Sequence, residues 1–182
     1  AGQWVNGNLG FGFRRLSIVD LSDRANQPFK SAAGSVLVCN GEIYNANRLR
    51  EELVARGHRF TSASDCETAL HAYAEYGLSF VDHLDGMFAL AIFDIPRQRL
   101  ILARDRLGIK PLYYHVDASG VRFGSELKAI VVDPVVPTEI DPLAISLFFA
   151  RDVIPAPYTI YRGIHKLLPG EILVADLAQG PG

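Results

Sequence analysis

The sequence predicts a layered α+β fold in which antiparallel strands pack together with helices. Two pairs of strand-forming segments are each joined by a short turn, at residues 87–93 with 100–103 and at 112–116 with 121–123. Strands that follow one another through short turns pair antiparallel. The continuous apolar run at 87–93 predicts a strand that is covered on both faces. Helical patterns gather between these strand groups instead of following every strand, which excludes an alternating βαβ fold.

The other elements follow from local patterns. Residues 11–19 and 35–40 are rich in strand formers, with a turn-rich stretch between them. Leu49 and Leu53 stand four apart among charged residues, which predicts a helix that stops near Gly57. A second helix is expected to begin at Ser64, because its spacing to Glu67 fits a capping box.

Two parts of the chain differ in composition. Residues 1–130 hold the strand and helix patterns described above, and we expect them to form one body that contains the candidate site. Residues 131–182 contain a predicted helix at 142–149 and a segment interrupted by prolines, and we expect them to form a connector.

Composition narrows the classes of function. Hydrophobic residues make up 49% of the 182 residues, charged residues 21%, and the net charge is −2. This balance gives no reason to expect nucleic acid or an anionic membrane as a partner. No apolar run reaches the roughly 20 residues that span a bilayer, and no secretory leader is visible. We expect a cytoplasmic protein, and the start at Ala1 within a loop-like segment suggests a chain cut from a longer one.

Two clusters place polar groups at strand positions. Arg15 lies inside an apolar strand, where its planar guanidinium suits a carboxylate; a surface-facing arginine is the equal alternative. Asn40 ends the predicted strand at 35–40, and Gly41 and Glu42 follow it. An amide side chain beside a glycine N–H offers two donors to one oxygen, as an oxyanion hole requires. A plain turn is the alternative, since Asn-Gly is a common hairpin signal.

Two further clusters carry charge. Asp65 stands at a predicted helix start, where it either binds an ammonium group or complements the helix dipole. Residues 104–111 form a charged turn after a buried strand, and we expect an ion-pair cluster that fixes this loop.

Several other chemistries are disfavoured. The five histidines do not fall at metal-ligand spacing with another ligand, so no metal site is expected. No glycine-rich loop with lysine precedes a helix as a phosphate cradle. Cys39 and Cys66 have no histidine nearby in sequence to activate them, and we expect both to be buried and unpaired.

Taken together, these clusters resemble the class II glutamine amidotransferases, in the order and spacing of the asparagine synthetase branch. The matching segments cover nearly the whole chain and lie at 13–22, 40–45, 64–67, 85–89 and 103–114. The proline-rich segment at 154–170 is similar to the passage into an ATP-using synthetase domain. Phe13 departs from the family pattern, which often has histidine there.

The resemblance implies an N-terminal-nucleophile hydrolase fold, a four-layer α/β/β/α sandwich of two antiparallel sheets between helices. It implies that the thiol of an N-terminal cysteine attacks the side-chain amide of glutamine, with its own α-amine as base. Arg15 would hold the substrate carboxylate, and Asp65 its ammonium group with help from Glu42. The Asn40 side chain and the Gly41 N–H would form the oxyanion hole.

The resemblance also implies what the rest of the parent does. Ammonia would pass to a C-terminal synthetase domain that uses ATP and Mg²⁺ to amidate aspartate, and the domain described here would need no cofactor. The family's cysteine segment is absent from these 182 residues, so we expect the chain alone to be inactive. A non-catalytic binding module and a synthetase with another acceptor remain alternatives, and the oligomeric state stays open, a homodimer included.

Overall fold

A five-stranded antiparallel sheet forms one central layer of the molecule. The computed structural model describes residues 1–14, 20 and 22–177. The strand order is β10-β6-β5-β4-β3, and the strands comprise Ile172–Asp176, Arg99–Arg104, Gly86–Asp94, Ser35–Ile43 and Phe29–Lys30. The predicted pairing of 87–93 with 100–103 is confirmed as β5 with β6.

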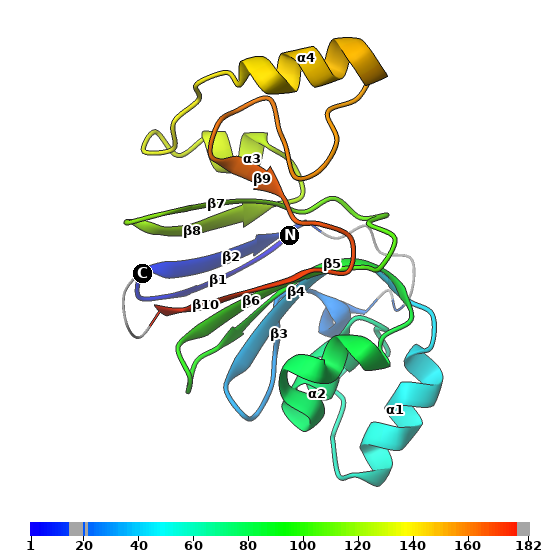
Figure 1. The fold of residues 1–182 in the computed structure, drawn as a ribbon. Coiled ribbons are helices and arrows are strands. Elements are labelled where there is room, and N and C mark those ends of the chain that lie inside the picture. Colours follow the sequence, from blue (N-terminus) through cyan, green and yellow to red (C-terminus); the bar gives the residue numbers. More distant parts are fainter. Residues whose placement is uncertain (15–19, 21, 178–182) are drawn as a thin grey trace.

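Two smaller antiparallel sheets face this layer (Figure 1). One is the hairpin of β1 (Gly2–Asn6) and β2 (Leu9–Phe13), and the other has the order β8-β7-β9, with strands Gly120–Gly124, Tyr113–Asp117 and Ile164–Lys166. The layered antiparallel prediction is therefore confirmed. Within the described residues the second layer consists of two separate sheets, where the prediction had one.

Helices cover the outer faces of both sheet layers (Figure 1). The five-stranded sheet carries α1 (Ala46–Ala55) and α2 (Glu67–Tyr76), and α3 (Lys128–Val131) and α4 (Pro142–Arg151) lie beyond the opposite layer. Short 3₁₀ turns occupy Asp23–Ala25 and Gly77–His83. The order helix, sheet, sheets, helix gives the four predicted layers.

The side chains of the five-stranded sheet alternate in direction, and an apolar cluster covers each face. Leu37 and Leu90 point to the helices and pack with Leu49 and Leu53 of α1 in one apolar cluster. On the other face, a second cluster fills the space between the sheet layers; it includes Val36, Val38, Ala91, Phe93, Leu102, Phe11 and Leu112. The prediction of a doubly covered strand at 87–93 is confirmed.

The start of α2 differs from the prediction. The helix begins at Glu67, with Cys66 at the N-cap position and no side-chain cap. The predicted capping box between Ser64 and Glu67 is therefore wrong, because the Glu67 carboxylate is bonded to the preceding loop.

The charged loop after β6 also differs from the prediction. Arg104 donates three hydrogen bonds to backbone oxygens, those of Gly108, Lys110 and Leu167. The buried Asp105 accepts from four backbone N–H groups, those of Phe88, Leu107, Ile109 and Lys110. Among the described residues, the expected ion pairing in this loop is limited to an exposed contact between Arg106 and Asp85 at 3.4 Å. Backbone groups, not opposite charges, satisfy the two inner side chains.

Residues after 131 contribute to both sheet layers. Strand β9 pairs with β7, and β10 pairs with β6. The predicted helix at 142–149 is confirmed as α4; Asp141 caps it by accepting from the Leu143 N–H at 2.9 Å. The predicted division into a body of residues 1–130 and a connector of residues 131–182 stays a prediction.

Candidate functional site

The end of β4 carries three of the predicted site residues. Asn40, Gly41 and Glu42 all lie within the strand and pair with Ala89, Phe88 and Met87 of β5. The alternative of a plain turn at Asn40-Gly41 is therefore wrong. A Cβ atom on Gly41 would lie 2.1 Å from the Met87 backbone oxygen, so only glycine allows the two strands to approach this closely.

The free edge of β4 has three alternate residues whose backbone groups point away from β5. They are Cys39, Gly41 and Ile43, and β3 covers this edge only as far as Leu37. The Cys39 N–H and C=O bond to the Gln27 side chain. The Ile43 N–H donates to Asp65 Oδ2 at 2.8 Å. Among the described residues, none accepts a hydrogen bond from the Gly41 N–H on this edge.

Asn40 borders a cavity of about 300 Å³ between the sheet layers. The wall opposite Asn40 is formed by β2 and β8, through Gly10–Phe13 and Val121–Gly124. The half-buried Asn40 amide makes no hydrogen bond to any described residue. Its donors therefore remain available next to the open Gly41 N–H.

Asp65 is held beside this strand end. Its Oδ2 atom accepts from Ile43, and its backbone oxygen accepts from the N–H and hydroxyl of Thr68 in the first turn of α2. The second carboxylate oxygen accepts no hydrogen bond from the described residues. A half-buried carboxylate with one open oxygen is suited to an ammonium group.

Asp65 lies beside the predicted strand end, whereas the predicted roles of Glu42 and Arg15 have no such support. Glu42 is exposed, and its side chain makes no hydrogen bond within the described part of the chain. Arg15 lies outside the described residues, so its predicted role stays a prediction. Asp20, a few residues farther along, accepts from the Ala63 N–H at 2.7 Å in the loop that leads to Asp65.

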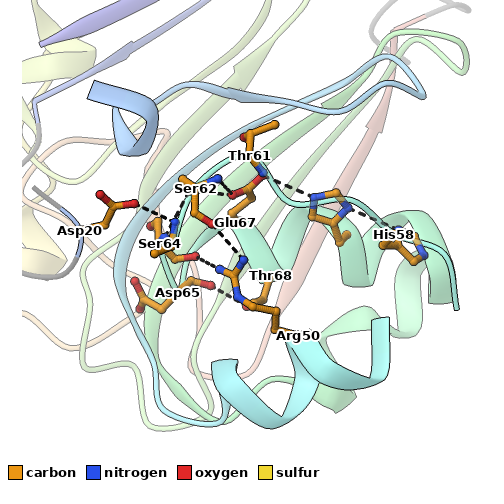
Figure 2. Close-up of polar contacts among 11 residues, drawn as sticks. Asp20, Arg50, His58, Thr61, Ser62, Ser64, Asp65, Glu67 and Thr68 are labelled. Carbon is orange, nitrogen blue, oxygen red and sulfur yellow. Dashed lines mark hydrogen bonds and ion pairs between the residues drawn. The ribbon is translucent and has the colours of Figure 1, made fainter. Parts of the chain in front are cut away.

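The loop at 61–65 is fixed by a buried carboxylate, Glu67, which the sequence had suggested as part of a capping box. Figure 2 shows Glu67 pointing back to Thr61 and Ser62, away from the helix it begins. Glu67 is 2% exposed and accepts from both backbone N–H groups and both hydroxyls of these two residues, at 2.6–2.8 Å. Burial raises the pKa of Glu67, but hydrogen bonds from His71, Ser62 and Thr61 outweigh it and lower the pKa to about 2. The loop is therefore tied to an ionised group.

Arg50 of α1 holds the same loop from the other side (Figure 2). It donates to the backbone oxygens of Ser62 and Ser64 at 2.9 and 2.7 Å. Its guanidinium also lies 4.1 Å from the centre of the Phe60 ring. Together with Glu67 and Asp20, Arg50 fixes the segment that presents Asp65.

The two cysteines lie in the core of the domain. Cys39 and Cys66 are both free and buried, as predicted. The pKa of the Cys39 thiol is raised well above its usual value by the hydrogen bond to Cys66 and by burial. A thiol acts as a nucleophile through its thiolate, which both effects suppress.

Residues 1–180 match the family described as the glutamine amidotransferase domain. The chain belongs to this family. It is 40% identical over 174 residues to an asparagine synthetase (glutamine-hydrolyzing) 3 of Bacillus subtilis, which covers 93% of this chain and 28% of that protein. It is 38% identical over 176 residues to the amidase chry2 of Gibberella zeae, which covers 95% of this chain and 26% of that protein.

Two solved structures share the fold of this amidotransferase domain. The glutamine phosphoribosylpyrophosphate amidotransferase of B. subtilis aligns with a TM-score of 0.56 at 24% identity, over 85% of this chain and 30% of that one. A structure described as the allosteric regulatory enzyme of purine biosynthesis aligns at 0.59 and 22%, over 86% and 30%. The predicted N-terminal-nucleophile hydrolase fold is confirmed.

The described residues contain neither a cluster of metal-ligating side chains nor a helix that could span a membrane. No group of three or more His, Cys, Asp or Glu side chains is placed to hold a metal ion in the part of the chain that the structure describes. Within the same residues, no helix has the length and apolar character needed to cross a bilayer. The predicted lack of a metal site stays a prediction.

Proposed function

We propose that this chain is the glutamine-hydrolysing domain of an asparagine-synthetase-type enzyme. It releases ammonia from glutamine, and a C-terminal part of the parent uses that ammonia with ATP and Mg²⁺ to amidate aspartate. The observation that carries this proposal is the open Gly41 N–H, which lies next to the unbonded Asn40 amide and between two neighbours whose N–H groups are already bonded. A cytoplasmic setting, in which thiols stay reduced, suits this chemistry.

In this proposal, the site residues bind glutamine and stabilise the oxyanion that forms during its hydrolysis. Arg15 binds the α-carboxylate of glutamine, and Asp65 binds the α-ammonium group through its open oxygen, with Glu42 contributing negative charge. A cysteine thiolate attacks the side-chain carbonyl carbon, with its α-amine as the base. Asn40 and the Gly41 N–H donate to the resulting oxyanion, each contributing about 3 kcal/mol to transition-state stabilisation. Ammonia then leaves, and water hydrolyses the thioester to glutamate.

The attacking thiol in this proposal comes from a part of the parent outside these 182 residues. Cys39 and Cys66 are buried within the apolar cluster on the helix side of the sheet. The cavity that borders Asn40 also touches Cys39, but its other walls come from β2 and β8, on the side of the sheet away from α1 and α2. A cysteine-bearing segment that enters this cavity would bring a thiol to the oxyanion donors without disturbing the core.

The 182-residue chain alone is expected to release no glutamate from glutamine, whereas the full-length parent releases glutamate and ammonia in equal amounts. Coupled assays for both products, run with a no-protein blank, measure this. Glutamate release by the chain alone would show that one of its own groups is the nucleophile. A folded parent that produces neither would favour the alternative of a non-catalytic binding module.

The acceptor of the ammonia is a separate question, because the chain has nearly the same identity to an asparagine synthetase and to an amidase, 40% and 38%. The chain spans only about a quarter of the length of either protein. A synthetase with another acceptor is therefore the second candidate. Incubation of the parent with glutamine, ATP and aspartate distinguishes them: asparagine formation supports the first, and glutamine hydrolysis without asparagine supports the second.

A further inference from the structure

Gln27 lies where the ladder between β3 and β4 would continue. Phe29 pairs with Leu37 and Lys30 with Val36. Hydrogen-bonded pairs recur at every second residue of an antiparallel ladder. The next such pair after Phe29 and Leu37 would therefore join residue 27 to residue 39. The main chain does not supply this pair, because β3 begins at Phe29.

The side chain of Gln27 supplies the two missing hydrogen bonds. Its Oε1 atom accepts from the Cys39 N–H at 2.6 Å, and its Nε2 atom donates to the Cys39 oxygen at 2.8 Å. Gln27 is 5% exposed and Cys39 is 2% exposed, so water does not compete for these groups. A side-chain amide has the same donor and acceptor as a peptide group, which lets it stand in for a strand.

This substitution of a side chain for a strand has a consequence two residues farther along. If the main chain of β3 continued in register, its next pair would fall on Gly41 and would occupy the Gly41 N–H. The two hydrogen bonds between the Gln27 side chain and the Cys39 backbone, called the clamp below, instead end the ladder at Cys39. Asp65 bonds the Ile43 N–H on the far side. The N–H groups of Cys39 and Ile43 are thus both bonded, while the Gly41 N–H between them stays open.

We propose that Gln27 is a positioning residue for the oxyanion donor at Gly41, acting through the backbone of Cys39. The inference rests on the proposed function. Gln27 does not touch the substrate; it holds the plane of the strand so that the Gly41 N–H points at the developing oxyanion. Glutamine itself, before reaction, is held by other groups and does not depend on this alignment.

The test compares Gln27→Met and Gln27→Glu with Gln3→Met, an exposed control on β1, in the full-length protein. Gln27→Met is expected to lower kcat for glutamine hydrolysis about 10-fold to 100-fold, since small displacements of catalytic groups have effects of this size. KM is expected to change less than about threefold, because ground-state contacts remain. A role confined to folding would instead lower the melting temperature and active fraction and leave kcat per folded molecule unchanged.

Gln27→Glu provides a second readout. An ionised carboxylate accepts from the Cys39 N–H but repels the Cys39 oxygen, whereas a protonated carboxyl restores both hydrogen bonds. Burial disfavours the ionised form of such a group. The ratio of variant to wild-type kcat is therefore expected to rise as the pH falls from about 8 to about 6. A ratio that stays flat over this range contradicts the proposal.

Hydrogen exchange of the peptide covering residues 36–41 tests whether Gln27 holds the Cys39 backbone, separately from whether this contact affects kcat. Loss of the clamp in Gln27→Met is expected to speed exchange in this peptide about tenfold, with no change in Gln3→Met. Faster exchange with kcat within about twofold of wild type would overturn the positioning role. A wild-type protein that does not hydrolyse glutamine would overturn the proposed function and the positioning role with it, while exchange would still report whether the clamp exists.

Discussion

Replacing Asn40 by alanine is expected to lower kcat for glutamine hydrolysis by the full-length protein about 100-fold to 1,000-fold. Removal of one oxyanion-hole donor has this effect in other enzymes, equivalent to about 3–4 kcal/mol. The Asn40 amide bonds to no described residue, so its loss leaves no buried group without a partner. Steady-state release of glutamate gives kcat and KM, and urea unfolding is expected to differ little from wild type.

Asn47→Ala is the matched control for this prediction, because Asn47 is exposed on α1 and its side chain makes no hydrogen bond with the described residues. Its kcat is expected to equal that of wild type. If Asn40→Ala retains kcat within about fivefold, the side chain is not an oxyanion donor, and the site assignment at the end of β4 fails.

Replacing Glu67 by glutamine is expected to destabilise the chain by about 2–4 kcal/mol at neutral pH. The carboxylate accepts from four donors on Thr61 and Ser62. An amide of the same shape turns an NH₂ group toward two of them, and each buried donor left without an acceptor costs about 1–3 kcal/mol. For a chain of this size, the melting temperature should fall by about 4–16 °C. Calorimetry of the variant and of Glu51→Gln, an exposed control on α1, measures the difference.

The stabilisation that Glu67 provides is expected to decrease as the pH falls. Its pKa in the folded chain is lowered from the ordinary value of 4.5 to about 2. The unfolded chain therefore binds the proton more tightly, and the stabilisation is complete above pH 4.5 and is lost as the pH falls toward 2. The difference in unfolding free energy between wild type and Glu67→Gln should shrink over this range. A difference that is constant from pH 7 to pH 3 would mean that Glu67 is not held as an ion.

Local patterns were sufficient to predict most elements. The spacing of Leu49 and Leu53 predicted α1, and the apolar run at 87–93 predicted a strand buried on both faces. Both depend on side-chain periodicity within one segment, which the sequence displays directly. The division of the second layer into two sheets depends on which distant segments pair, and no local pattern contains that information.

The candidate site was predictable only in part. Asn40 and Gly41 allowed two interpretations; their pairing with β5 excludes the plain turn, and the oxyanion role stays a prediction. Gln27 was missed because its partner Cys39 lies 12 residues away and is a backbone group, which leaves no complementary side chain in the sequence. Glu67 was interpreted as part of a capping box because the local spacing fits one. In the folded chain the Thr61–Ser62 turn offers it four donors, and that arrangement depends on tertiary structure.

The most direct test of the glutamine site is a crystal structure of the full-length protein after reaction with 6-diazo-5-oxo-L-norleucine, a glutamine analogue that alkylates a nucleophilic thiol. We expect an adduct whose carbonyl oxygen lies about 3 Å from both the Asn40 side-chain nitrogen and the Gly41 nitrogen. Its α-ammonium group should contact Asp65. An adduct on Cys39 or Cys66, or one whose oxygen bonds to neither Asn40 nor Gly41, would contradict this expectation.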